Sequence, residues 1–300
     1  MIKFKQFFYV LVIGVVLYSC GDNGNNNVAS FDHAAQAVID NDSIVKFLKN
    51  NYYNETDGVV EPLEDGKTAL YDDSRLNNKD VKENDIDYKL YYFVVREGQG
   101  TPNPTPSDPN RVKGHPTKMD SVLTKYSGRR ILNNKSVSSI FDINTTWLTL
   151  TRVIVGWREG LIHFKGGEIN IVPNEPIKYK NGGKGILFIP SGLAYRNIPQ
   201  TGIPANSVLM FDVELWDHVE DTDEDNDLIP SIYEDVVNGD GDPRNDDSDG
   251  DGIPNYRDTD DDNDGKLTKD EDANKDGDPR NDFSDTSKPT VPDYLNRNIR

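Results

Sequence analysis

The chain has 300 residues, and 35% of them are hydrophobic, so it can fill one moderate core but hardly two large ones. Its net charge of −19 is concentrated in residues 220–285, where 26 acidic and 6 basic residues give −20 and leave the rest of the chain close to neutral. A segment this acidic is repelled by nucleic acid, which excludes nucleic acid as its partner and favours a cation or a basic surface. The one cysteine, Cys20, excludes an intrachain disulfide.

Residues 1–20 have the pattern of an export signal. Lys3 and Lys5 precede an apolar run over residues 7–17, which leads into Leu-Tyr-Ser-Cys20. This pattern resembles a bacterial lipoprotein signal peptide, which implies cleavage before Cys20, acylation of that residue and a lipid anchor at the bacterial envelope, facing the periplasm or the cell surface. Two alternatives stay open: a plain secretory signal, and a transmembrane anchor, for which about 11 apolar residues are too few. The polar residues 21–27 predict a flexible tether.

Residues 21–87 are predicted to hold this tether, a helical extension and a linker. Ser43 is a plausible N-cap for a helix with an apolar stripe, and a second short helix is predicted over 31–40. The stripe consists of Ile44, Val45, Phe47, Leu48 and Tyr52. It can fold onto the main domain or serve as a dimerisation arm. Residues 54–87 are polar, and their apolar residues show little periodicity, which predicts a linker.

The main domain is predicted over residues 88–218. Alternating or β-rich runs predict strands at 88–95, 121–126, 147–151, 184–190 and 207–216, with a short helix around 154–163. An antiparallel sheet crossed by one helix is an α+β fold. Two segments interrupt it: the four prolines of 101–109 predict a surface excursion, and residues 169–182 predict an inserted hairpin.

Three motifs follow one another in this domain: Val153-Ile-Val-Gly-Trp-Arg-Glu-Gly160, Ser191-Gly-Leu-Ala-Tyr195 and the run 203–215. Together they resemble the active-site frame of the FKBP-type peptidyl-prolyl isomerases, and the resemblance covers roughly residues 88–217. It implies an antiparallel half-barrel wrapped on a short helix, and rotation about the amide that precedes a proline. That reaction moves no proton and needs no cofactor, because its barrier comes from amide resonance.

The resemblance assigns eight residues to the substrate pocket. Trp157 would form the floor, the Ile154 N–H would donate to the substrate, and the Tyr195 hydroxyl would bind a substrate carbonyl. The walls would be Ile203 and Phe211 on one side and Tyr126, Phe141 and Asp142 on the other. The simpler alternative is an aromatic core without a site. Tyr195 and Asp142 argue against it, because a dry core disfavours their polar groups. The chain departs from the family pattern at Arg196, where a glycine is usual.

Residues 219–285 contain a duplicated unit, since Asp240-Gly-Asp-Pro-Arg-Asn-Asp246 recurs as residues 276–282. Residues 260–271 have the register of an EF-hand calcium loop, with glycine at position 6. Residues 247–258 have the same register and resemble the calcium-binding thrombospondin type 3 repeats, and residues 223–234 are a poorer copy with Leu228 in place of the glycine. The predicted ligands are Asp260, Asp262, Asp264, Lys266 and Glu271; Asp247, Asp249, Asp251 and Asp258; and Asp223, Asp225, Asp227 and Glu234.

The alternative for this acidic region is a disordered, solvated tail. Aspartate at every second position followed by glycine instead indicates calcium as a structural cofactor whose binding is coupled to folding. Residues 286–300 are predicted to be a C-terminal tail. The whole sequence predicts a lipid-anchored prolyl isomerase that acts on proline-containing polypeptides and assists folding of exported proteins. The rival hypothesis is a non-catalytic chaperone or assembly module that binds proline segments and carries a calcium-dependent spacer.

Overall fold

The computed structural model describes residues 31–170, 172–173, 175 and 177–299. The predicted signal peptide, Cys20 and the tether lie outside the described residues. Within the described part, no helix has both the length and the apolar character needed to cross a membrane.

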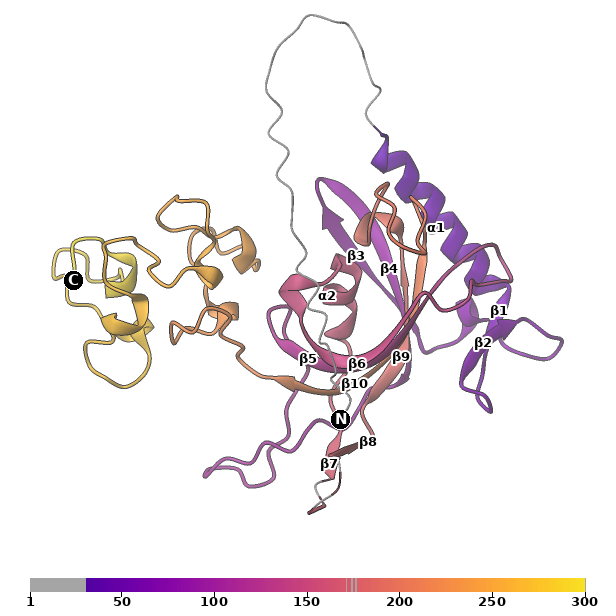
Figure 1. Ribbon diagram of the computed structural model, residues 1–300, viewed down its shortest axis with the longest axis horizontal. Coiled ribbons are helices and arrows are strands. Elements are labelled where there is room, and N and C mark those ends of the chain that lie inside the picture. Colours follow the sequence, from indigo (N-terminus) through magenta and orange to yellow (C-terminus); the bar gives the residue numbers. More distant parts are fainter. Residues whose placement is uncertain (1–30, 171, 174, 176, 300) are drawn as a thin grey trace, which may run out of the picture. The chain divides into compact units, whose positions relative to one another are not determined.

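One antiparallel sheet of six strands organises the main domain (Figure 1). In spatial order its strands are β3 (Leu76–Glu83), β4 (Ile86–Arg96), β9 (Gly183–Ile189), β10 (Leu209–Val219), β5 (Ser121–Arg130) and β6 (Asp142–Thr149). The helices are α1 (His33–Lys49) and α2 (Val155–Leu161), and two small hairpins pair β1 (Asn51–Asn54) with β2 (Val59–Pro62) and β7 (Glu168–Asn170) with β8 (Lys178–Lys180). The α+β class and the hairpin inserted after α2 are thereby confirmed.

Both faces of the central strands are buried, each by a different helix. Along β9, Leu187 and Ile189 pack in the core that contains Trp157 of α2, whereas Ile186 and Phe188 pack in a second core that contains Phe47 of α1. Successive side chains of a strand point to opposite faces, which is why the run Ile-Leu-Phe-Ile is apolar throughout. Figure 1 shows α1 and α2 on opposite sides of the sheet.

The prediction of two helices before residue 50 was wrong, because α1 is continuous from His33 to Lys49. Asp32 is its N-cap and accepts from the Ala35 N–H at 2.9 Å. Ser43 lies inside the helix and donates to the Ile39 carbonyl at 2.8 Å. The polar residues before Ser43 suggested a break, but Asp40 is buried against the main domain. The helix therefore folds onto the sheet, as the first of the two alternatives predicted.

The prediction of a linker over 54–87 was also wrong, because this segment contains β2 and β3. The strand β3 pairs with β4 along its whole length, from Leu76 opposite Phe93 to Glu83 opposite Ile86. Between them, Asn84 and Asp85 both have positive φ, at 51° and 59°, the conformation of a tight two-residue hairpin turn. As an edge strand, β3 buries few side chains, so its sequence lacks the apolar alternation of an inner strand.

The acidic region consists of loops and short 3₁₀ turns. These turns are Ser231–Tyr233, Pro243–Asn245, Asn255–Arg257, Thr268–Glu271, Pro279–Asn281 and Asp293–Leu295. In both copies of the duplicated unit, an aspartate caps the turn and pairs with the arginine two residues later: Asp242 with Arg244 at 2.5 Å, and Asp278 with Arg280 at 2.7 Å. These two aspartates therefore have arginine partners already.

Candidate active site

A cavity of about 430 Å³ opens between α2 and the sheet. It is lined by Tyr126, Asp142, Leu148, Arg152, Val153, Ile154, Trp157, Tyr195 and Phe211. Six of the eight predicted pocket residues are among them. The other two, Phe141 and Ile203, lie in the adjoining core rather than in the lining.

The aromatic rings of the cavity meet edge to face. Trp157 and Phe211 are 5.1 Å apart at 88°, Tyr126 and Trp157 are 4.7 Å apart at 89°, and Phe141 packs edge-on against Phe211 at 5.7 Å. This arrangement matches the quadrupoles of the rings and fixes their positions. Gly128 of β5 makes room for it, since a Cβ there would lie 2.6 Å from Phe211 and 2.7 Å from Phe141.

Few polar groups face this aromatic site. The Tyr126 hydroxyl donates to Asp142 Oδ2 at 2.8 Å. Burial and this bond raise the pKa of Tyr126, and burial followed by the charge of Asp142 raises the pKa of Tyr195, so both phenols stay neutral hydrogen-bond donors at neutral pH. The indole Nε1 of Trp157 is buried without a hydrogen-bond partner. The site therefore offers donors in an apolar setting.

The segment that carries Tyr195 is held by α1. Asp40, 1% exposed, accepts from the Ser191 N–H at 2.7 Å and from the Ser191 hydroxyl at 2.6 Å. Sequence reasoning missed Asp40, because the contact joins residues 151 positions apart. It also missed Arg152 and Val153, which line the cavity just before α2. Arg196 adopts the left-handed conformation with φ 56°, which explains why glycine is usual at this place.

Comparison with known proteins agrees with this geometry. Residues 112–216 match the family model of the FKBP-type peptidyl-prolyl cis-trans isomerases. Residues 112–216 are therefore similar to an FKBP-type isomerase domain. The match begins after β4, although β4 pairs with β9, so the six-stranded sheet extends beyond the matched residues.

Two relatives and one solved structure illustrate the similarity. The chain is 34% identical over 128 residues to the FKBP-type peptidyl-prolyl cis-trans isomerase FkpA of Escherichia coli K12, covering 43% of this chain and 37% of that protein. It is 32% identical over 148 residues to FkpA of Buchnera aphidicola subsp. Schizaphis graminum, covering 46% and 52%. The crystal structure of E. coli FkpA aligns with 30% identity and a TM-score of 0.31, over 47% of this chain and 52% of that one. The chain thus spans about half of the length of such relatives or less.

The pocket suits rotation about a prolyl amide. The planar amide is held by resonance with a barrier of roughly 18–20 kcal/mol, and the twisted amide has less charge separation. An apolar pocket that excludes water disfavours the planar form more than the twisted one, and fixed donors can stabilise the rotated carbonyl. Trp157 and Phe211 supply the apolar surface, and the Tyr195 hydroxyl supplies a donor, because the Tyr126 hydroxyl already donates to Asp142.

Two histidines, the half-buried His163 and the buried His218, lie outside this pocket. His163 stacks on Tyr92 at 4.0 Å, and His218 is 0% exposed. Burial, helped by Lys79 and Lys113 respectively, lowers the pKa of both to about 4, so both are neutral at physiological pH.

We expect the isomerase rate to be flat between about pH 6 and pH 8, because the reaction transfers no proton and neither histidine titrates there. The contribution of the two histidines to the free energy of unfolding, taken as the difference between wild type and a histidine variant, should instead fall as the pH drops from about 6.5 towards 4. The unfolded chain binds protons at the ordinary histidine pKa, whereas the folded chain excludes them until about pH 4. Prolyl-peptide kinetics and urea midpoints measure the two effects. His163→Gln should keep the rate and weaken the pH dependence of stability; a bell-shaped rate profile would contradict the mechanism.

The acidic region brings together five groups of three carboxylates among the described residues. In each group, the potential ligand oxygens lie within 4.8 Å of one another. The groups are Asp223, Asp225 and Asp227; Asp227, Glu234 and Asp261; Asp235, Asp240 and Asp246; Asp247, Asp249 and Asp251; and Asp260, Asp262 and Asp264. Three groups contain positions 1, 3 and 5 of the predicted loops, and a fourth takes Asp240 and Asp246 from the duplicated unit. The group of Asp227, Glu234 and Asp261 was not predicted.

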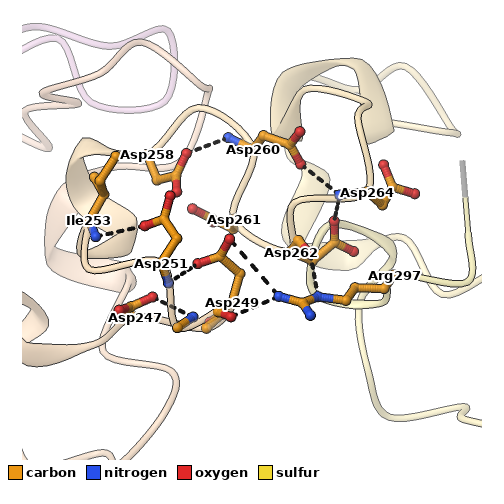
Figure 2. Close-up of polar contacts among 12 residues, drawn as sticks. Asp247, Asp249, Asp251, Ile253, Asp258, Asp260, Asp261, Asp262, Asp264 and Arg297 are labelled. Carbon is orange, nitrogen blue, oxygen red and sulfur yellow. Dashed lines mark hydrogen bonds and ion pairs between the residues drawn. The ribbon is translucent and has the colours of Figure 1, made fainter.

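The carboxylate oxygens of these loops are available to a cation. Asp262 Oδ2 and Glu271 Oε1 are buried without hydrogen-bond partners, and burial, with the charge of Asp262 next, raises the pKa of Glu271 to about 8. Figure 2 shows the Asp251 and Asp258 carboxylates facing each other at the end of the second loop. Hard oxygen ligands in this number fit calcium. The position-12 acids Asp258 and Glu271 would add ligands to the triads.

The three loops share one backbone form. The residue at position 6 has a positive φ, 96° for Gly252 and 93° for Gly265, and its N–H donates to the position-1 aspartate at 3.0 and 3.1 Å. Leu228 adopts the same conformation, with φ 81°, and donates to Asp223 at 3.1 Å. A non-glycine residue in this region costs roughly 1–2 kcal/mol. The poorer copy therefore keeps the loop geometry at the cost of strain.

The first loop is bonded to the active-site segment through Glu224, whose side chain is 5% exposed. It accepts from the Thr151 hydroxyl at 2.5 Å and from Arg152 Nε at 2.7 Å, and Arg257 donates at 3.2 Å. Burial would raise the pKa of Glu224, but the hydrogen bonds from Thr151 and Arg152 hold it below its usual range. Since Arg152 lines the pocket, Glu224 connects the acidic region to the wall of the site.

Proposed function

We propose that this protein is a peptidyl-prolyl cis-trans isomerase of a bacterial envelope that assists the folding of exported proteins. The observation that carries the proposal is the edge-to-face aromatic cavity around Trp157, with the neutral donor Tyr195 at its wall, in a segment that matches the FKBP-type family model. Its substrates would be proline-containing polypeptide segments, bound with the proline ring on Trp157.

The test is cis/trans exchange of an X-Pro peptide with purified protein, with and without calcium. We expect exchange well above the uncatalysed rate, and inhibition by macrolides of the FK506 or rapamycin type. A folded protein that binds proline peptides without accelerating exchange would instead be a chaperone or assembly module, the non-catalytic alternative.

We further propose that Cys20 is acylated and anchors the protein to the membrane. The support is the sequence pattern: a basic start, an apolar run and Leu-Tyr-Ser-Cys20. Cys20→Ser should prevent lipid attachment and move the protein from the membrane fraction to the soluble fraction, with the isomerase rate unchanged. Metabolic labelling with a fatty acid measures the attachment. A Cys20→Ser protein that still requires detergent for extraction would indicate an uncleaved apolar anchor.

We also propose that the three loops over 223–234, 247–258 and 260–271 bind calcium as a structural ion. The support is their common backbone form and their buried carboxylate oxygens. Bound calcium would neutralise carboxylates that otherwise repel one another and would couple ion binding to folding of the acidic region.

A further inference from the structure

Three carboxylates, two from the first loop and one from the third, meet in the interior of the acidic region. Asp227 and Glu234 are 0% exposed and Asp261 is 1% exposed, and oxygens of the three lie within 4.8 Å of one another. Asp227 Oδ1 accepts from the Ile229 N–H at 2.8 Å. The other five oxygens, Asp227 Oδ2 and both oxygens of Glu234 and of Asp261, have no hydrogen-bond partner. Such a group is costly unless something binds it.

The described protein side chains supply no cation for this group. Within residues 31–170, 172–173, 175 and 177–299, no lysine or arginine forms an ion pair with Asp227, Glu234 or Asp261. The nearby Arg280 is paired with Asp278 and lies over the Tyr233 ring at 4.5 Å. Burying even one carboxylate without a partner costs several kcal/mol, and three in contact also repel one another.

Asp261 is not a ligand of its own loop. The oxygens of its neighbours Asp260 and Asp262 lie near those of Asp264 in the third loop, whereas an oxygen of Asp261 lies near those of Asp227 and Glu234. In Figure 2 the Asp261 side chain points away from that of Asp264. It reaches the first loop instead, where Asp227 and Glu234 occupy positions 5 and 12.

The repeat supports this reading of Asp261. Glu224 occupies position 2 of the first loop, 37 residues before Asp261. The backbone N–H of Glu224 donates to Ser231 Oγ at 3.1 Å, and that of Asp261 donates to Thr268 Oγ1 at 3.2 Å. Both side chains then contact a segment that lies earlier in the chain: Glu224 contacts Arg152, and Asp261 contacts the first loop. Glu224 meets the cations Arg152 and Arg257, whereas Asp261 meets only carboxylates.

We propose that Asp227, Glu234 and Asp261 bind a calcium ion that joins the first loop to the third. All the ligands are hard oxygens from flexible loops, which suits calcium better than the smaller, strictly octahedral magnesium. The site differs from the EF-hand pattern because one ligand comes from a different repeat at a position that the pattern leaves free. It fastens together two loops of a region with few apolar residues. The inference rests on the proposed calcium binding of the first loop, whose position-5 and position-12 residues Asp227 and Glu234 it uses, and does not depend on the isomerase activity.

The test is equilibrium dialysis of the full-length protein in detergent, which counts the calcium ions bound per chain. Wild type is compared with Asp261→Asn and with the control variant Asp270→Asn. Asp270 is an exposed neighbour that belongs to none of the five carboxylate groups. Asp261→Asn should bind one ion fewer per chain than wild type, and Asp270→Asn should match wild type. Combining Asp261→Asn with Asp262→Asn should remove two ions. Equal ion counts for Asp261→Asn and Asp270→Asn would overturn the proposal.

Terbium luminescence gives a second readout that does not depend on the count. Tyr294 is 2% exposed and lies near the three carboxylates, whose charges, after burial, raise its pKa. Terbium excited through tyrosine should therefore emit from the wild-type protein and be displaced by calcium. Glu234→Gln and Tyr294→Phe should each reduce that emission, with the circular dichroism and the isomerase rate unchanged. Wild-type emission in both Glu234→Gln and Tyr294→Phe would overturn the site even if Asp261→Asn failed to fold.

Discussion

Phe211→Ala and Trp157→Ala are expected to remove most of the isomerase activity. Trp157 forms the floor of the cavity and Phe211 meets it edge-on at 5.1 Å, so the loss of either ring admits water to the place where the amide must twist. Burial of one such ring contributes about 2–3 kcal/mol. If half of this free energy is lost from the stabilisation of the transition state, the rate falls about tenfold. Loss of the pocket's shape lowers the rate further.

The control distinguishes loss of the pocket from loss of the fold. Large-to-small changes of this kind cost about 3–5 kcal/mol of stability, so Trp157→Phe and Phe211→Leu should be measured beside the alanine variants. Trp147, on the neighbouring strand β6, is 45% exposed and does not line the cavity. Trp147→Ala should keep nearly full activity. A folded Trp157→Ala protein with wild-type exchange rates would show that catalysis occurs elsewhere.

Removal of calcium is expected to expand residues 219–300 and expose them to protease, whereas millimolar calcium should protect them. The metal-free region carries a net charge of −20 over residues 220–285, and burial together with neighbouring carboxylates raises the pKa of Glu234 to about 11 and of Asp261 to about 9. These groups hold a charge in the folded state only when a cation compensates it. An affinity of about 10⁻⁴–10⁻³ M is typical of extracellular modules.

Limited proteolysis with chelator, calcium or magnesium measures the effect. Magnesium should protect poorly, since it gives up its water reluctantly. Asp262→Ala and Glu271→Ala should weaken binding at the third loop more than Asp225→Ala weakens it at the first, where Leu228 strains the turn. Identical digestion patterns in chelator and calcium would show that the acidic region is a solvated spacer.

The sequence determined the parts of this protein that depend on local spacing. Alternating strands, the short helix with Trp157 and the inserted hairpin were predicted because their patterns repeat within a few residues. The set Tyr126, Trp157, Tyr195 and Phe211 could be named because three motifs occur in order. The loop register also gave three of the five carboxylate groups, since position 1, 3 and 5 side chains share one face of a turn.

Only the tertiary structure showed which residues from distant segments of the chain contact each other. The edge strand β3 was missed because its exposed side has no apolar alternation, and α1 was split because the buried role of Asp40 depends on Ser191, far along the chain. Asp261 looked like a spacer between two ligands, and only the approach of the first loop puts Glu234 beside it. Local patterns record which residues a segment buries, but the partner of a buried charge is fixed by how separate segments pack.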